Sequence, residues 1–147
     1  MTFVRPFSPT DIQQIAEVVN QSLGENYPPS LYLTVHNLWG DGFLVVTDLG
    51  RIVGFVAAVP SGGKGARVLM LAILPESRRQ SLGKILMEEL YTRCRTKGFD
   101  TVVLEVRKSN KTAIAFYEHQ GFSIYGEFKS FYSNGEDAWK MIKSLQN

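Results

Sequence analysis

The feature that most constrains this fold is an amphipathic, helix-length segment between two short, almost wholly apolar runs. The two runs are residues 67–74 and 101–106. Between them, apolar side chains recur at the spacing of one helix face, at Leu82, Ile85, Leu86, Leu90 and Cys94. A strand, a crossover helix and a second strand in one sheet place the two strands parallel to each other. Because both runs are so apolar, we expect both strands to be buried on both faces.

The N-terminal part predicts a strand, two helices and a hairpin. Residues 3–5 favour a short strand, Ser8 and Pro9 suit a helix start, and Gly24 suits its end in a left-handed conformation. A second short helix is expected after the two prolines at 28–29. Two strands and the turn between them follow, at residues 43–47, 52–59 and 48–50.

The C-terminal part predicts one more helix and a hairpin. Residues 111–119 favour a helix that Gly121 ends, and residues 122–131 and 137–145 are expected to pair across the turn signal Asn134-Gly135. The whole chain, residues 1–147, is thus interpreted as a single mixed α/β domain whose N-terminal half is mostly antiparallel.

Composition excludes several classes of protein. The chain has 147 residues, 44% of them hydrophobic, and a net charge of +2, which gives no reason to expect nucleic-acid binding. No apolar stretch reaches the length of a membrane span, and the N-terminus lacks a signal-peptide core, so we expect a cytoplasmic protein without membrane partners. Cys94 has no disulfide partner and is expected to be a buried structural thiol. His36 and His119 lie far apart in a chain without a cysteine cluster, so no metal site is expected.

A basic turn at the start of the central helix is a candidate phosphate site. Residues 75–84 follow the first apolar run and contain Arg78, Arg79, Gly83 and Lys84. The first turn of a helix has unpaired N–H groups and the positive end of the helix dipole, and both attract phosphate. The alternative is a solvated basic turn that binds nothing.

Polar side chains near the second apolar run form a candidate catalytic set. Alternation places Glu105 on the strand face opposite Leu104, and a carboxylate in so apolar a strand needs either a basic partner or an open cleft. An apolar setting raises a carboxyl pKa, which suits a general base near neutral pH. Asn110 and Tyr117 are two helical turns apart and share a face, although Asn110 is equally suited to cap that helix and Tyr117 to pack on the sheet.

These residues carry a resemblance to a known family. The segment Arg78-Arg79-Gln80-Ser81-Leu82-Gly83 resembles the acetyl-CoA-binding motif Arg/Gln-x-x-Gly-x-Gly/Ala of the GNAT family of N-acetyltransferases, with Ser81 in place of the first glycine. The pattern Asn110-x-x-Ala113-x-x-x-Tyr117-x-x-x-Gly121-Phe122 resembles the family's second CoA-binding element. Residues 25–28, 106–110 and 132–138 are similar to the protein N-terminal acetyltransferases, namely the catalytic subunit of N-terminal acetyltransferase A, its archaeal counterparts and the bacterial ribosomal-protein alanine acetyltransferases.

The resemblance implies a fold and a cofactor. It implies a mixed central sheet of about seven strands with about four helices, in which strands four and five splay apart to hold acetyl-CoA. The backbone of Leu71, Ala72 and Ile73 would pair with the pantetheine arm, and one N–H group would stabilise the thioester oxygen. The amides of the next turn would hold the pyrophosphate, at Arg79, Gln80, Ser81, Leu82, Gly83 and Lys84. Asn110 and Tyr117 would add contacts to the cofactor. The side chain of Ser81 brings a Cβ atom close to the expected pyrophosphate.

The resemblance also assigns roles in catalysis. Glu105 would be the general base that takes a proton from the acceptor amine, directly or through water, with Glu25 as an alternative. Tyr117 would be the general acid, or a hydrogen-bond donor, for the departing CoA thiolate. Substrate contacts would come from Glu25, Tyr27 and Tyr132, in a slot that admits a free chain terminus. Tyr27 is equally suited to anchor its loop, and Tyr132 to pack within the last hairpin.

We therefore interpret the chain as an acetyl-CoA-dependent N-terminal α-acetyltransferase that works by direct attack of the amine and without a metal. The expected acceptors are protein or peptide N-termini with small first residues, or with Met before an apolar residue, and the ribosome or an auxiliary subunit is a conceivable partner. The alternatives are an acetyltransferase of the same fold that acts on lysine or a small amine, and a non-catalytic CoA-binding regulatory module.

Overall fold

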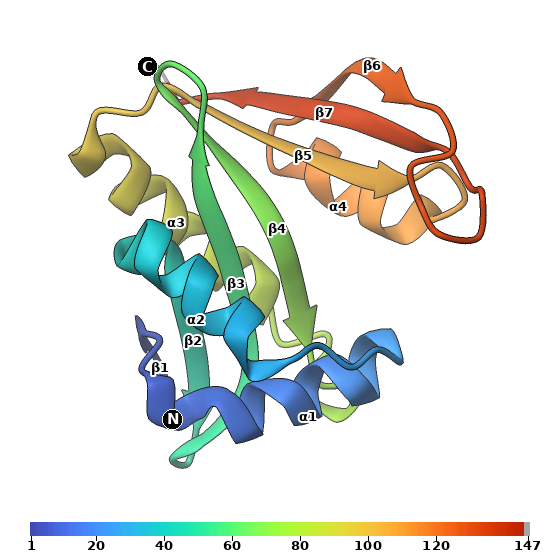
Figure 1. Ribbon diagram of the computed structural model, residues 1–147. Coiled ribbons are helices and arrows are strands. Elements are labelled where there is room, and N and C mark those ends of the chain that lie inside the picture. The colour runs from blue at the N-terminus through green and yellow to red at the C-terminus, as the bar shows by residue number, and fades with distance from the viewer. Residues whose placement is uncertain (146–147) are drawn as a thin grey trace.

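A single seven-stranded sheet organises the chain in the computed structural model, which describes residues 1–145 (Figure 1). The strand order is β1-β2-β3-β4-β5-β7-β6. The strands are β1 (Thr2–Pro6), β2 (Phe43–Asp48), β3 (Arg51–Ser61), β4 (Gly65–Ile73), β5 (Thr101–Arg107), β6 (Ser123–Phe128) and β7 (Ala138–Ser144). Of the paired strands, β4 and β5 are parallel and the others antiparallel, as the sequence predicts.

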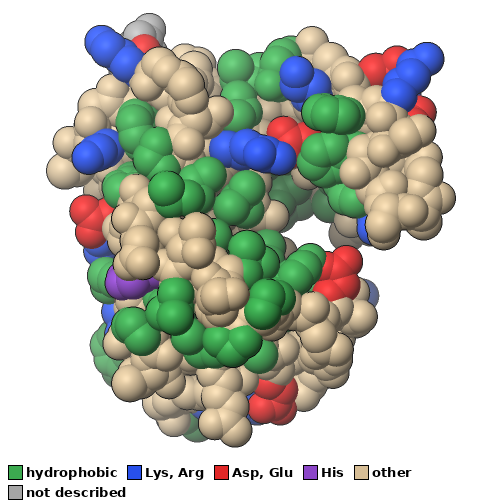
Figure 2. All heavy atoms as spheres, viewed as in Figure 1, with side chains coloured by type: hydrophobic (Ala, Val, Ile, Leu, Met, Phe, Trp, Pro, Cys, Tyr) green, Lys and Arg blue, Asp and Glu red, His purple; other side chains and the backbone are tan. Residues whose placement is uncertain are grey.

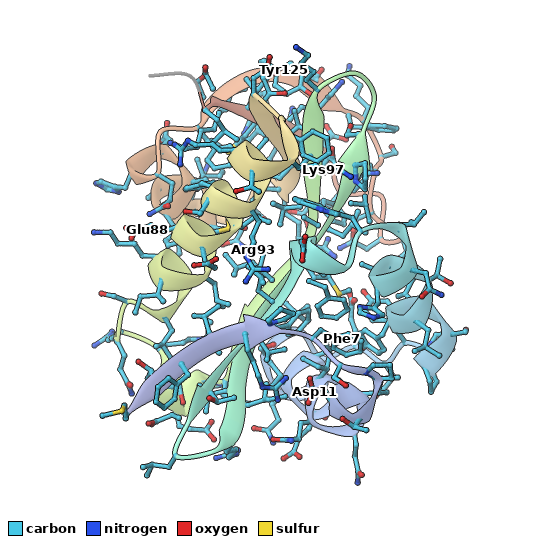
Figure 3. All side chains as sticks on the ribbon, turned by 90° about the vertical axis from the view of Figure 1, so that its left-hand side faces the viewer. Phe7, Asp11, Glu88, Arg93, Lys97 and Tyr125 are labelled. Atoms are coloured by element: carbon cyan, nitrogen blue, oxygen red, sulfur yellow. The ribbon has the colours of Figure 1, made fainter. Side chains whose placement is uncertain are left out.

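In the described part of the chain, residues 1–145, four α-helices cover the sheet. They are α1 (Ile12–Leu23), α2 (Pro29–Leu38), α3 (Leu82–Lys97) and α4 (Lys111–His119), and three short 3-10 turns precede α1, β2 and α3 at Pro9–Asp11, Gly40–Gly42 and Pro75–Ser77. Helix α3 covers one face of β2 to β4, whereas α1 and α2 cover the other (Figure 3). Helix α4 lies beside β5 and β7 (Figure 1). The fully buried side chains of Ile15, Phe55, Leu86 and Leu104 belong to the core between these layers.

The parallel pair of strands separates soon after it begins. The pairing of β4 with β5 is limited to Gly65 with Thr101, Ala66 with Val102, and Arg67 with Val103. Beyond this point β4 continues to pair with β3, but a bulge at Leu69 interrupts the register, which passes from Ala58 opposite Val68 to Ala57 opposite Met70. A bulge bends its strand, so β4 turns away from β5. The sheet is therefore split along its middle, as expected for strands four and five.

The prediction that both central strands are buried on both faces is wrong. In β5, Leu104 and its alternate neighbours are buried, but Val103 and Glu105 on the other face are only half-buried. In β4, Leu69 is 38% exposed and Leu71 is half-buried. The separation of the two strands explains this result, because side chains at the split face an opening instead of a packed neighbour.

The C-terminal hairpin pairs as predicted, but its turn is longer than expected. Strand β6 ends at Phe128, opposite Ala138 in β7, and residues 129–137 form a loop between them. Asn134-Gly135 makes a local turn inside this loop, where the Gly135 N–H donates to the carbonyl of Tyr132 at 2.8 Å. The carboxylate of Asp137 accepts the N–H of Ser130 at 2.8 Å and holds the base of the loop. This loop projects beside the split in the sheet.

A buried carboxylate fixes the start of the first helix to β1. Asp11 accepts the Ser8 N–H at 2.8 Å and two hydrogen bonds from the Arg5 guanidinium at 2.8 and 3.0 Å. Burial by itself raises the pKa of Asp11, but the bonds from Arg5 and Ser8 outweigh it, so the pKa of Asp11 is lowered. A carboxyl group whose pKa is lower in the folded chain stabilises the fold above its unfolded pKa and loses that contribution as the pH falls.

Asp11→Asn is therefore expected to lower the free energy of unfolding at pH 7 by about 1–3 kcal/mol, as measured by urea unfolding. The difference from the wild type should shrink below about pH 4, where the unfolded carboxyl becomes protonated. Asp41→Asn is the control, because Asp41 is an exposed carboxylate paired with Arg93 at the surface. An equal loss of stability at pH 7 and pH 3 would contradict the assignment.

Candidate active site

The open edge of β4 supplies the first part of the site. The N–H of Leu74 donates to the carbonyl of Val53 at 2.8 Å, so it points toward β3. Backbone N–H groups alternate in direction along a strand, which also directs the N–H of Ala72 toward β3 and those of Leu71 and Ile73 toward the split. An unpaired strand edge accepts an extended ligand as an additional strand.

The turn before α3 supplies a concave set of backbone donors. Within residues 1–145, the N–H groups of residues 79–84 donate to no backbone carbonyl. Arg79 and Ser81 adopt left-handed conformations, with φ of 69° and 59°, and left-handed residues among right-handed ones gather successive N–H groups into an anion-binding concavity. The side chain of Arg78 turns instead to the end of β4, where its Nε donates to the carbonyl of Ile73 at 3.3 Å. The geometry is that of a phosphate site built from backbone.

Ser81 occupies a position that favours glycine for a backbone reason. It is the residue that precedes α3, with φ 59° and ψ 23°, and L-residues with a Cβ atom are disfavoured by about 1–2 kcal/mol in this region. The departure from the family motif therefore carries a conformational cost in the turn itself, in addition to the Cβ atom that it brings near the ligand.

Ser81→Gly is expected to remove this cost and to raise the free energy of unfolding by up to about 1 kcal/mol, while acetyl-CoA affinity is kept or improved. Ser81→Val should act in the opposite direction, because β-branched residues tolerate positive φ least. Thermal unfolding and isothermal titration with acetyl-CoA measure both effects. Equal stability of the glycine and valine variants would show that the turn is not strained at this position.

Gly83 brings a second helix against the phosphate turn. A Cβ atom at Gly83 would lie 3.3 Å from the ring atom Cζ of Phe116, in α4. The absence of a Cβ atom at Gly83 thus lets α4 pack closely against the start of α3. This contact holds α4, the helix that also carries Tyr117, against the start of α3.

Glu105 and Arg67 form an ion pair at the point where β4 and β5 separate. The Nε and Nη2 atoms of Arg67 both donate to Oε1 of Glu105, at 2.9 and 2.7 Å. The Glu105 side chain is 12% exposed and that of Arg67 is 38% exposed. The basic partner that sequence alone left as an alternative is thus present, and the carboxylate also borders the split.

Tyr117 is a protonated phenol in an apolar setting. Its ring packs edge-on against Phe116 and Phe122, and its hydroxyl has no hydrogen-bond partner in the described part of the chain. Burial, with a smaller contribution from Tyr132, raises the pKa of Tyr117 to about 12. The hydroxyl therefore remains a donor at neutral pH. Asn110 caps α4, where its Oδ1 accepts the N–H of Ala113 at 3.1 Å.

Tyr132 joins this group from the 129–137 loop. The guanidinium of Arg107 lies 3.9 Å from the centre of its ring. Burial raises the pKa of Tyr132, Arg107 lowers it, and the charges of Glu105 and Glu136 raise it further. Tyr132 therefore interacts electrostatically with both Glu105 and Tyr117, which come from different elements of the fold.

Glu25 and Tyr27 come from the loop between α1 and α2, where the Tyr27 hydroxyl donates to the Glu25 carboxylate. This loop and the 129–137 loop lie on opposite sides of the split sheet (Figure 1). The space-filling view shows a hollow between the two halves of the molecule, bordered by hydrophobic side chains (Figure 2). No hydrogen bond or ion pair among residues 1–145 links Glu25 or Tyr27 to Glu105.

Other potentially reactive features lie outside this region. Cys94 is fully buried, and burial raises the pKa of its thiol to about 12, as expected for a structural cysteine. No three His, Cys, Asp or Glu side chains of residues 1–145 are placed to hold a metal ion. None of the helices in that range is long and apolar enough to cross a membrane.

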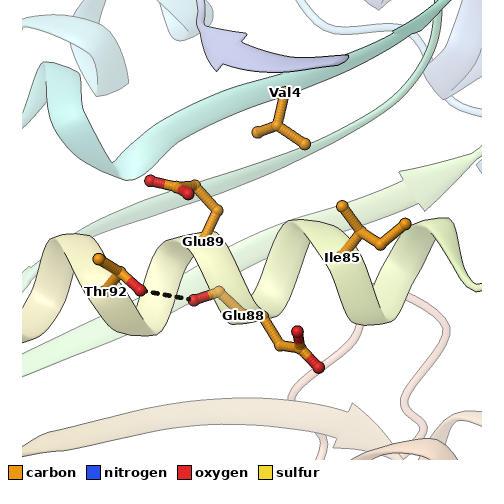
Figure 4. A pocket seen from close by; sticks show the side chains of 5 residues that line it. All are labelled: Val4, Ile85, Glu88, Glu89 and Thr92. Atoms are coloured by element: carbon orange, nitrogen blue, oxygen red, sulfur yellow. Dashed lines mark hydrogen bonds between the residues drawn. The ribbon is translucent and has the colours of Figure 1, made fainter. Parts of the chain in front are cut away.

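A separate open hollow of about 320 Å³ lies between β1 and α3 (Figure 4). It is lined by Val4, Ile85, Glu88, Glu89 and Thr92. Its carboxylates are exposed or paired with neighbours on α3, as Glu89 is with Arg93 at 2.9 Å. Because its lining comes from β1 and α3, the hollow is distinct from the split between β4 and β5.

Comparison with known proteins agrees with this geometry. A model of the acetyltransferase (GNAT) family matches residues 12–122, and the chain belongs to this family of acetyl-CoA-dependent N-acetyltransferases. The N-terminal acetyltransferase B complex catalytic subunit NAA20 of Arabidopsis thaliana is 35% identical over 152 residues, covering 99% of this chain and 86% of the relative. N-alpha-acetyltransferase 30 of Schizosaccharomyces pombe is 28% identical over 146 residues, 97% of each protein. The crystal structure of Ard1 from Thermoplasma volcanium has a TM-score of 0.95 at 34% identity and covers 99% of both chains.

Proposed function

We propose that this protein transfers the acetyl group of acetyl-CoA to the free α-amine of a polypeptide. The observation that carries the proposal is the early separation of β4 from β5, which leaves the edge of β4 open next to the turn of unpaired N–H groups and across the split from Glu105. Relatives of nearly the same length that are named N-alpha-acetyltransferases support the α-amine as the acceptor.

The described residues fit two parts of acetyl-CoA, the pyrophosphate and the pantetheine arm. The free N–H groups of residues 79–84 suit the pyrophosphate, because they converge at a helix N-terminus without any competing carbonyl. The open backbone of Leu71 and Ile73 suits the pantetheine arm, which carries amides that pair like a strand. Asn110 uses its Oδ1 to cap α4 and retains its amide N–H₂ for a contact to the same arm.

The acetyl thioester supplies an activated carbonyl, and the chain supplies proton acceptors and donors around it. Glu105 takes a proton from the α-amine, which is mostly protonated at pH 7, directly or through water. The amine nitrogen then forms a bond to the acetyl carbon as the carbon–sulfur bond breaks, and the second proton of that nitrogen passes to the departing thiolate, so that CoA leaves as its thiol. The N–H of Leu71 or Ile73 stabilises the negative charge on the carbonyl oxygen.

Tyr117 acts on the departing sulfur. With a pKa of about 12, its hydroxyl is protonated throughout the working pH range. An ordinary thiol has a pKa near 8.5, so complete proton transfer from Tyr117 to the thiolate is uphill, and most of the stabilisation comes from the hydrogen bond it donates. Tyr117 therefore acts mainly as a hydrogen-bond donor to the departing thiolate.

The acceptor enters between the two loops. Tyr132 forms one wall with Arg107 against its ring, and the hydrogen-bonded pair Glu25 and Tyr27 forms the other. A slot of this kind favours a chain terminus, because a lysine in the middle of an extended backbone cannot present its amine with both flanking segments still attached. The expected first residues are small, such as Ser, Ala or Thr. Met before an apolar residue is a second acceptor class.

The proposal is tested with peptides that begin Ser, Ala, Met-Leu or Met-Glu and each contain an internal lysine. The purified protein is incubated with acetyl-CoA and each peptide, and mass spectrometry locates the added acetyl group. We expect acetylation of the α-amine and no reaction with peptides whose N-terminus is blocked. Acetyl on lysine alone would overturn the proposal in favour of a lysine acetyltransferase. Acetyl-CoA binding without any transfer would indicate a binding module or a requirement for an auxiliary subunit.

Glu105→Gln should lower kcat by about 100-fold or more, because a neutral amide cannot accept the amine proton. Acetyl-CoA affinity should change little, since Glu105 lies outside the phosphate turn and the open edge of β4. Steady-state rates and calorimetric titration separate the two effects. Glu89→Gln, at an exposed ion pair of α3, is the control. Near-wild-type turnover of the Glu105 variant would transfer the role of base to Glu25, the next residue to replace.

A further inference from the structure

The ion pair between Arg67 and Glu105 occupies a specific place in the fold. Arg67 is opposite Val103 in the last residue pair that joins β4 to β5. Glu105 lies two residues further along β5, where the strands have already separated, and its side chain is on the same face as that of Val103. Arg67 therefore reaches from the last paired position into the mouth of the split.

The geometry of the pair distinguishes the two carboxylate oxygens of Glu105. Both donors of Arg67 converge on Oε1, at 2.9 and 2.7 Å. No hydrogen bond is made to Oε2 by the residues of the described range, 1–145. A guanidinium is planar and presents its donors in a rigid fork, so two bonds to one oxygen restrict the rotation of the carboxylate. One oxygen is held, and the other remains able to accept a proton.

The other charged groups near Glu105 are directed elsewhere. Lys140 is opposite Glu105 in the pairing of β5 with β7, but its ammonium lies 5.1 Å from the centre of the Tyr125 ring. Arg107, on the same face of β5, pairs with Glu136 at 3.0 Å and packs on Tyr132. Among described residues, Arg67 is the one that forms a hydrogen bond or an ion pair with the Glu105 carboxylate.

We propose that Arg67 is a positioning residue for the general base: it holds Oε1 of Glu105 so that Oε2 faces the acceptor amine. The inference rests on the proposed base role of Glu105. It extends that role to a residue of another strand, 38 positions away in the chain. Because Arg67 acts through Glu105, its loss should lower the rate of proton removal while the cofactor site stays intact.

Arg67→Met keeps the length of the side chain and removes its donors. We expect kcat to fall by about 10-fold to 100-fold, the usual effect of a displaced catalytic group, with the dissociation constant for acetyl-CoA and the melting temperature close to those of the wild type. Arg67→Lys restores one charged donor without the fork, and we expect it to recover part of the rate. Arg93→Met is the matched control. Arg93 lies on α3, away from the split, and is a partly buried arginine paired with Glu89 and with Asp41.

The double variant Arg67→Met with Glu105→Gln separates positioning from a direct role. If Arg67 acts only through Glu105, the double variant should have the same kcat as Glu105→Gln alone. A further tenfold loss in the double variant would overturn the proposal and give Arg67 a direct contact with substrate. Full activity of Arg67→Met would overturn it as well. If Arg67→Met folds but is slow, an equally slow Arg67→Lys variant would also overturn the proposal.

These rates are measured with whichever amine the wild type acetylates in the peptide panel. Acetylation of lysine alone would therefore refute the proposed α-amine specificity and leave the test of Arg67 intact. If Arg67→Met does not fold, Arg67→Gln, which retains a neutral donor, replaces it in both comparisons. The two proposals thus fail through different observations.

Discussion

The candidate site depends on one limit to backbone pairing, namely that β4 and β5 remain hydrogen-bonded for only three residue pairs. Parallel strands that are joined by a crossover helix usually continue side by side, but the bulge at Leu69 bends β4 away. The separation leaves backbone donors of β4 unpaired at an edge where a ligand can satisfy them. It also exposes the side chains of β5 that face the opening, including Glu105. The cofactor edge and the base therefore arise from the same distortion.

Helix packing then determines what surrounds the opening. The contact of Phe116 with Gly83 holds α4 against the start of α3, where the turn of free N–H groups lies. The ring of Tyr117 packs against the rings of Phe116 and Phe122, and this partial burial raises the pKa of its hydroxyl. A donor that cannot ionise at neutral pH is suited to a leaving thiolate. Stability and chemistry are linked here, since the packing that closes the domain also sets the protonation state of the phenol.

Local patterns predicted the elements well because they depend on neighbours in sequence. The helix at residues 111–119 agrees with α4 residue for residue, and Gly24 has the expected left-handed conformation. The family motif placed Arg79 to Lys84 at a helix start, as observed. The errors have a common cause: Leu69, Leu71 and Val103 are as apolar as core residues, and hydrophobicity cannot tell a packed neighbour from a cleft. The long 129–137 loop was missed because Asn134-Gly135 is a turn signal at any loop length.

The sequence by itself determined the parallel crossover, the order of strands and helices along the chain, and the basic turn before α3, since each follows from periodicity and local backbone preference. Only the tertiary structure decided how far β4 and β5 stay together, which arginine pairs with Glu105, and which glycine serves packing. Arg67 and Glu105 are 38 residues apart, and no local pattern relates them. Their meeting depends on the register of two strands and on the bend in one of them, which are set by packing across the whole domain.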